Sequence, residues 1–158
     1  MDNEDIGAKK ANMTTNDSNS GEKKTGECEK RVGAGDVNGA LLAYLGDAQL
    51  ELCVRRRLVT SGGKLGALNA KADGMVSAKA QCRALEILMP LFTEEEKSAY
   101  NRGKNIHTNN IPKSVSALQY RKATGLEAVF GYLCIIGDTG RIEYLVGVGF
   151  FGEQNQSG

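Results

Sequence analysis

The chain has 158 residues, of which 41% are hydrophobic and 25% charged, with 20 Lys and Arg against 19 Asp and Glu. This length suits one ordinary domain, and the absence of Trp, with only two Pro, argues against a β-sandwich or a Pro-rich scaffold. A formal net charge of +1 excludes a strongly basic nucleic-acid binder of the histone kind.

Residues 1–36 are a polar, low-complexity segment whose apolar residues recur at no helix or strand spacing. Because such a segment buries too little apolar surface to offset its ordering entropy, we expect a disordered N-terminal tail. It holds eight acidic and six basic residues, a net charge of −2, so residues 37–158 hold the other 11 acidic and 14 basic residues, a net charge of +3. The part expected to fold is therefore mildly basic.

Residues 37–150 are predicted to be helical throughout, because apolar residues recur near the helical period and no stretch alternates with period two. The predicted helices cover residues 37–59, 64–71, 74–89, 93 to about 103, 115–136 and 141–150. In the first of them the apolar repeat consists of Leu41, Leu45, Leu52 and Val59. The sequence thus predicts an all-α fold with one domain over residues 37–150, followed by a short C-terminal tail over residues 151–158.

Local signals mark several helix ends. Asn38 suits an N-cap, and Thr93 with Glu96 three residues later matches a capping box. Gly137 and Asp138 are expected to end the long helix. The clearest loop is GKNIHTNNIPK at 103–113, which combines Gly, Pro, Thr and three Asn.

The four cysteines are far apart, form no CxxC pair, and share the chain with a single His, which argues against a zinc site. No stretch approaches the roughly 18 apolar residues that a membrane-spanning helix needs. We therefore expect a cytoplasmic protein with no membrane association.

Two acidic residues stand in apolar helical surroundings. Asp47 lies within the first predicted helix and Glu127 within the long one, each with Gly close by. A carboxylate in such a setting must be neutralised, paired or bound to a metal ion. One interpretation is that both acids converge on one Mg²⁺, which prefers oxygen ligands. The other is that each is a boundary residue paired with a base, for which 55–57 and Arg121 offer candidates, and spacing alone does not decide between them.

Four short motifs carry a family resemblance. YLGDAQLEL at 44–52 resembles the signature helix of the ribonuclease III family, and GLEA at 125–128 resembles its second acidic motif. VSAKAQ at 76–81 and YRKATG at 120–125 are similar to the Mini-ribonuclease III branch in particular. The resemblance covers about residues 37–150 in consistent order, and no double-stranded-RNA-binding domain is expected after it.

The resemblance implies a helical bundle of the ribonuclease III endonuclease-domain type, acting as a homodimer. It implies Mg²⁺-dependent hydrolysis of double-stranded RNA to 5′-phosphate and 3′-hydroxyl ends, with Mn²⁺ as an alternative ion and precursor 23S ribosomal RNA as the substrate. The family's catalytic, metal-binding acids carry over onto Asp47 and Glu127. Larger members have two further acids, whose positions are occupied here by Ala43 and Thr124.

Contacts to RNA are expected to depend on backbone charge and shape, because the major groove of an A-form duplex is too narrow to read. The candidate RNA-binding residues are Lys79, Arg102, Lys104, Asn105, Lys113, Arg121 and Lys122. His107 is interpreted as a loop surface residue without a role. An alternative function remains open, a non-catalytic helical module that binds RNA or the ribosome, since Ala43 and Thr124 replace acids of the larger relatives.

Overall fold

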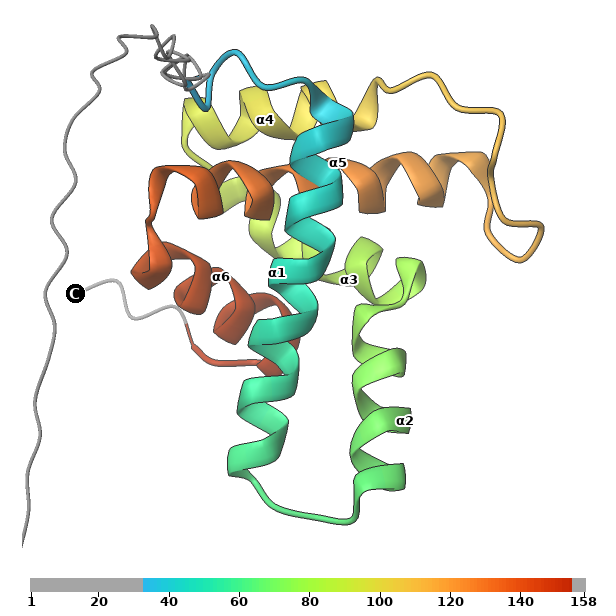
Figure 1. Ribbon diagram of the computed structural model, residues 1–158, viewed down its shortest axis with the longest axis vertical. Coiled ribbons are helices and arrows are strands. Elements are labelled where there is room, and N and C mark those ends of the chain that lie inside the picture. Colours follow the sequence, from blue (N-terminus) through green and yellow to red (C-terminus); the bar gives the residue numbers. More distant parts are fainter. Residues whose placement is uncertain (1–32, 155–158) are drawn as a thin grey trace, which may run out of the picture. The chain divides into compact units, whose positions relative to one another are not determined.

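The computed structural model describes residues 33–154, and within this range the chain forms helices and no strands (Figure 1). The elements are α1 (Gly39–Thr60), α2 (Leu65–Val76), α3 (Ala78–Leu88), the 3-10 turn η1 (Met89–Leu91), α4 (Glu94–Lys104), α5 (Ala117–Ile136) and α6 (Thr139–Phe151). The predicted all-α class is confirmed. The prediction of a disordered N-terminal tail concerns mainly residues 1–32, which lie outside the described residues. The last four residues of the predicted C-terminal tail, 155–158, lie outside them too.

The helix ends follow the cap chemistry of the sequence. The Asn38 side chain accepts a hydrogen bond of 3.0 Å from the Leu41 amide at the start of α1. Thr93 and Glu96 form the predicted capping box of α4, with reciprocal bonds of 3.3 and 2.9 Å. Gly137 ends α5 with φ of 76°, a left-handed conformation that glycine adopts without a steric penalty.

Besides α1, which starts at Gly39 rather than residue 37, three helix boundaries differ from the sequence prediction. The break between the second and third helices lies at Ser77, which caps α3 by accepting from the Ala80 amide, rather than at residues 72–73. Ser116 and Gln119 form a capping box that starts α5 at residue 117. Asp138 accepts from the Arg141 amide at 2.9 Å and starts α6 two residues earlier than expected. In each case a short polar side chain stops one helix or starts the next.

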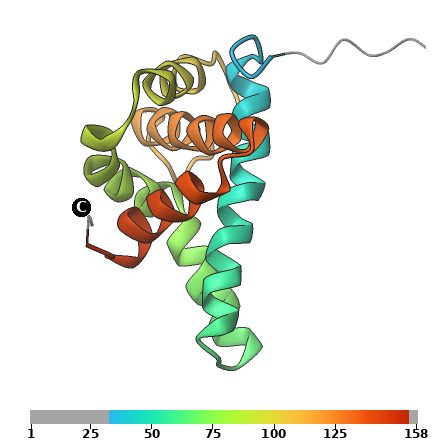
Figure 2. The same ribbon diagram turned by 90° about the vertical axis from the view of Figure 1, so that its left-hand side faces the viewer.

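α5 lies at the centre of the bundle, where Leu126, Val129, Phe130 and Leu133 are almost fully buried. The long helix α1 crosses α5, and α3, α4 and α6 pack around the same core (Figure 1). Seen from the side, α4, α5 and α6 all lie on one side of α1, while α2 runs beside its C-terminal half (Figure 2). The bundle thus presents two long helices in direct contact near its middle.

The buried side of α1 is not the apolar repeat noted in the sequence. Leu41, Leu52 and Val59 are 57, 53 and 66% exposed, whereas the core contacts come mainly from Leu42, Leu50, Cys53, Val54 and Leu58. α1 has apolar residues on both sides, so periodicity could not show which side packs against α5. The helix therefore keeps an exposed apolar face.

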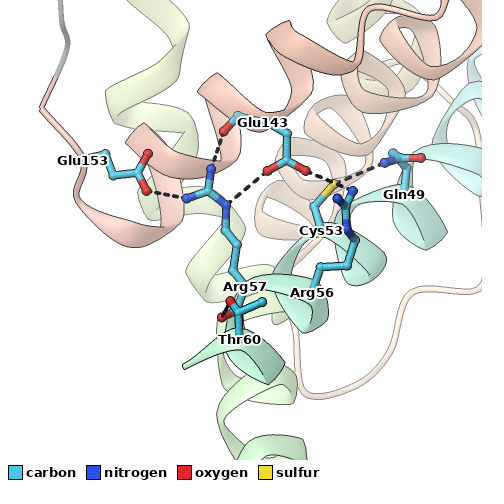
Figure 3. Close-up of polar contacts among 7 residues, drawn as sticks. All are labelled: Gln49, Cys53, Arg56, Arg57, Thr60, Glu143 and Glu153. Carbon is cyan, nitrogen blue, oxygen red and sulfur yellow. Dashed lines mark hydrogen bonds and ion pairs between the residues drawn. The ribbon is translucent and has the colours of Figure 1, made fainter. Parts of the chain in front are cut away.

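Arg57 connects the end of α1 to α6 and to the residues that follow it (Figure 3). Its guanidinium donates to the Glu143 carboxylate at 3.2 Å, to the Glu143 carbonyl at 2.9 Å, and to Glu153. The same group stacks over the Phe151 ring at 5.2 Å. Since its side chain is only 23% exposed, these charge-assisted bonds fix the C-terminal end of the bundle.

A buried ion pair joins α4 to α6. Glu96 is 2% exposed and accepts from Arg141 Nε at 2.8 Å and from a terminal guanidinium nitrogen at 2.9 Å. Arg141 also donates to the Leu91 carbonyl at 2.6 Å. The bidentate geometry satisfies a carboxylate that burial would otherwise destabilise.

Arg102 fixes the turn that precedes α1. One of its terminal nitrogens donates to the carbonyl oxygens of Ala34, Gly35 and Val37 at 3.3, 2.8 and 2.6 Å. The described part of the predicted tail, residues 33–36, is thus held against α4.

No described helix combines the length and low charge needed to span a bilayer.

Candidate active site

α1 and α5 touch backbone to backbone at two glycines. A Cβ built on Gly46 would overlap the carbonyl oxygen of Glu127, and one on Gly131 would overlap that of Leu42. Glycine inside a helix is unfavourable by about 1 kcal/mol relative to alanine, so its use here reflects the close approach. The contact brings Asp47, the neighbour of Gly46, to the same crossing as Glu127.

Both acids line one pocket of about 540 Å³. Its walls come from the first half of α1, the corner between α2 and α3, the loop after α4, and the first half of α5. Tyr44, Gln81 and His107 contribute side chains beside the two carboxylates. Asp47 is exposed and Glu127 is partly buried, so one acid faces solvent and the other lies deeper.

Neither carboxylate is neutralised by a base. Among residues 33–154, no ion pair involves Asp47 or Glu127. The arginines that sequence reasoning offered as partners are engaged elsewhere. Arg55 lies 3.6 Å from both Glu51 and Asp73, and its two neighbours in the chain pair with Glu143. The interpretation of the two acids as boundary residues paired with 55–57 or Arg121 is therefore wrong.

The surroundings favour the protonated form of both acids. Burial, together with the charge of Asp47, raises the pKa of Glu127 to about 7, although a hydrogen bond from Gln81 acts in the opposite direction. Partial burial and the nearby Glu51 raise the pKa of Asp47. Two neighbouring carboxylates with raised pKa values in one cleft are typical of functional sites.

The donor set fits a hard divalent cation. Carboxylate oxygens are the protein ligands that Mg²⁺ prefers, and Mg²⁺ commonly keeps several waters beside one or two carboxylates. Among the described residues, no three His, Cys, Asp or Glu side chains are grouped to hold a metal ion. The protein thus offers two carboxylates, which suits Mg²⁺ and does not provide an all-protein cage.

Ala43 and Thr124 line the same pocket, 6 and 8% exposed. The Thr124 hydroxyl donates to the Tyr120 carbonyl at 2.9 Å, so its hydrogen is used within its own helix. These two positions, at which the resemblance implies acids in larger members, therefore line the pocket and carry no charge in this chain.

None of the seven candidate RNA-binding residues lines the pocket. Lys79, Asn105, Lys113 and Arg121 are exposed, Lys122 is partly buried on α5, and Lys104 lies over the Tyr100 ring at 5.8 Å. Residues 105–116 connect α4 to α5, and five of them line the pocket. Arg102 donates to three backbone carbonyls instead, and it does not line the pocket.

Sequence reasoning missed Gln81, His107 and Tyr44 as pocket residues. Gln81 stands at the end of the VSAKAQ motif, so the resemblance had marked its segment without giving the side chain a role. His107 is exposed in the loop after α4, as the sequence predicts, and it also lines the pocket. Tyr44 lies one helical turn before Asp47 on α1, so its place could be found from the spacing, whereas Gln81 and His107 come from separate elements that no local pattern connects to the two acids.

Comparison with known proteins agrees with this geometry. A family model described as the ribonuclease III domain matches residues 40–138. The Mini-ribonuclease 3 of Brevibacillus brevis is 40% identical over 111 residues, covering 70% of this chain and 83% of the relative. That of Symbiobacterium thermophilum is 40% identical over 117 residues, covering 73 and 90%.

A solved structure has the same fold. The crystal structure of a protein from Fusobacterium nucleatum superposes with a TM-score of 0.68 at 31% identity, covering 75% of this chain and 96% of that one. The ribonuclease III family acts on double-stranded RNA and generally depends on a divalent metal ion. The match of this chain to that family favours the interpretation as an enzyme over the alternative of a non-catalytic module that binds RNA or the ribosome. This chain belongs to the ribonuclease III family and is an endoribonuclease, with Mini-ribonuclease 3 proteins among its relatives.

Proposed function

We propose that this endoribonuclease uses Mg²⁺, with Mn²⁺ as a substitute, to hydrolyse double-stranded RNA to 5′-phosphate and 3′-hydroxyl ends. The observation that carries the proposal is the pair Asp47 and Glu127. Two carboxylates from different helices line one pocket without an ion-pair partner among residues 33–154. A divalent cation would supply the positive charge that the surrounding protein lacks.

In the proposed mechanism Asp47 and Glu127 hold the ion. Bound there, Mg²⁺ supplies Lewis acidity toward the scissile phosphate and toward the water that attacks it. The exposed Asp47 lies on the open side of the pocket, whereas the deeper Glu127 is fixed by Gln81. Neither acid is required to act as a nucleophile, and the pocket offers no cysteine for that role.

RNA is proposed to lie across the open side of the pocket. Lys79, Lys104, Asn105, Lys113, Arg121 and Lys122 would contact its phosphates, with Arg102 supporting the α4 end of the same region. Such contacts are electrostatic, so binding should weaken steeply with salt. The loop of residues 105–116, which contributes five residues to the pocket lining, would then border the bound duplex.

We propose a homodimer formed through the exposed apolar face of α1. Leu41, Tyr44 and Leu52 are 57, 82 and 53% exposed, and their spacing of three and eight residues places them on one side of the helix. A second copy that packed there by twofold symmetry would cover the same residues in both chains. Because Tyr44 also lines the pocket beside Asp47, the interface would border the pocket. By the twofold symmetry, each of the two pockets would act on one strand of the duplex.

The natural substrate is proposed to be a structured precursor of 23S ribosomal RNA, processed in the cytoplasm. This proposal derives from the resemblance to the Mini-ribonuclease III branch, with which the names of the relatives agree. It is tested by comparing the cleavage rate on a precursor 23S stem with the rate on an unrelated perfect duplex of the same length. Equal rates on the two substrates would contradict it.

The central experiment replaces each acid by its amide. Asp47→Asn and Glu127→Gln should each abolish Mg²⁺-dependent cleavage of a labelled RNA duplex while the far-ultraviolet circular dichroism stays helical. The matched control is Glu86→Gln, which removes a charge from the exposed side of α3 and should leave the rate unchanged. Cleavage by Asp47→Asn at the parental rate, or parental cleavage that persists in EDTA, would contradict the assignment.

A further inference from the structure

Gln81 is a buried amide that connects three elements at the base of the pocket. It lies in the first turn of α3 and is 2% exposed. Its Nε2 donates to the carbonyl oxygen of Val76, the last residue of α2, at 3.0 Å. The same nitrogen donates to Oε1 of Glu127 on α5 at 2.9 Å. One side chain thus binds the end of one helix and an acid on another.

The two partners determine which way the amide faces. Both the Val76 carbonyl and the Glu127 carboxylate are acceptors, so the donor nitrogen of Gln81 must lie toward them. The carbonyl oxygen of Gln81 therefore faces away from both. That oxygen is buried and has no hydrogen-bond partner among the described residues, although the side chain lines the pocket. A buried acceptor left unsatisfied is unfavourable, and such atoms recur at functional sites.

We propose that Gln81 is the positioning residue of the metal site: its amide nitrogen holds Oε1 of Glu127 and leaves Oε2 for the ion. The inference rests on the proposed Mg²⁺ site. Outer partners that orient a metal-binding side chain commonly change metal affinity by 10- to 100-fold when removed.

The arrangement accounts for the choice of residue. A glutamate at this position would face the Glu127 carboxylate and the Val76 carbonyl with acceptors alone, and an apolar side chain would leave both without a donor. The bond to Val76 fixes the amide to the α2–α3 corner, so Gln81 has little freedom to turn away. The orientation of Glu127 is therefore set before the ion binds.

The test measures metal affinity in the full-length protein without RNA. Gln81→Met keeps the length of the side chain and removes both the donor and the acceptor. In a titration with Mn²⁺, in which electron paramagnetic resonance measures the free ion, the Kd of Gln81→Met for Mn²⁺ should be about tenfold or more above that of the parent. The Mg²⁺ concentration for half-maximal cleavage should rise by the same factor, while KM for duplex RNA at saturating Mg²⁺ stays unchanged. An unchanged Mn²⁺ Kd would overturn the proposal.

A matched control separates positioning from stability. Gln49 is also a partly buried glutamine, and it hydrogen-bonds Cys53 and Cys134 outside the pocket, so Gln49→Met should lower the Tm without changing the Mn²⁺ Kd. Gln81→Met should add no loss of affinity in a Glu127→Gln background, because Gln81 acts through Glu127. An additive loss in the double variant would contradict the proposal.

Two further results keep the inference distinct from the proposed function. If Gln81→Met does not fold, Gln81→Asn retains an amide that is one methylene too short for Glu127, and the same rise in Kd is expected. Wild-type protein that binds no Mn²⁺ would contradict the proposed function itself. Binding that is lost in Asp47→Asn but unchanged in the folded Gln81 variants would overturn only the positioning role.

Discussion

Gly46 of α1 lies against the backbone carbonyl of Glu127 on α5, with no space for a side chain between them. Since Asp47 follows Gly46, this contact places the two pocket acids on adjoining helix surfaces. Gly131, one turn after Glu127, makes the reciprocal approach to Leu42. The glycines are therefore part of the active-site geometry, although they have no side chains of their own.

Gly46→Ala is expected to destabilise the protein by about 3 kcal/mol or more, because its methyl group would overlap backbone that cannot move aside. Thermal unfolding followed by circular dichroism measures the effect. The control is Gly66→Ala on α2, where a Cβ meets nothing within 4 Å. Gly66→Ala should be neutral or stabilise the helix by up to about 1 kcal/mol. Equal stability of Gly46→Ala and the parent would contradict the close contact.

The metal-free protein should lose stability as the pH rises, because of Glu127. Its pKa is about 7 in the folded chain against 4.5 for an ordinary glutamate, so between these values the folded state keeps a proton that the unfolded state releases. The contribution of this proton to the free energy of unfolding is fully present below pH 4.5 and is lost as the pH rises to about 7, a change of about 3 kcal/mol. Denaturant unfolding in EDTA across this range measures it.

Glu127→Gln should remove the part of this pH dependence that comes from Glu127 and be the more stable protein near pH 8 without metal. Its amide oxygen still accepts from Gln81, and it carries no charge to bury. Added Mg²⁺ should raise the Tm of the parent but not of the variant. Glu86→Gln, exposed on α3, serves as the control and should change stability by less than about 0.5 kcal/mol throughout.

Arg57→Ala should lower the free energy of unfolding by about 2 kcal/mol, since it removes the bonds to Glu143 and Glu153 and the contact with the Phe151 ring (Figure 3). Urea denaturation provides the measurement. Arg56→Ala is the matched control: that side chain is 67% exposed and makes one 3.4 Å bond to Glu143. Its expected effect is below about 1 kcal/mol, and a similar loss in both variants would be evidence against the network.

Leu52→Glu should convert the proposed dimer to a monomer, because it places a charge on the exposed apolar face of α1. Sedimentation velocity measures the mass in solution. Ile87→Glu replaces an equally exposed apolar side chain on α3 and should leave the dimer intact. A parent that sediments as a monomer at micromolar concentration would contradict the dimer, and a dimeric Leu52→Glu would contradict this face.

Much of the fold could be predicted because the signals are local. Asn38, the Thr93–Glu96 capping box and Gly137 each act on backbone groups a few residues away, and they end helices where the structure places the ends. Ser77 was missed because the apolar pattern of α3 extends back past it into α2. Where two helices meet with no glycine or proline between them, a single serine is a weak signal.

The sequence by itself determined the helical class, the capped ends and the two acids in motifs of the ribonuclease III family. Only the tertiary structure decided which side of α1 is buried, that Asp47 and Glu127 share a pocket without basic partners, and that Gln81 binds Glu127. Hydrogen bonds and caps within a helix depend on neighbours in the chain, so they can be predicted from sequence. Contacts across helices depend on how the backbones approach, and here that approach is set at Gly46 and Gly131.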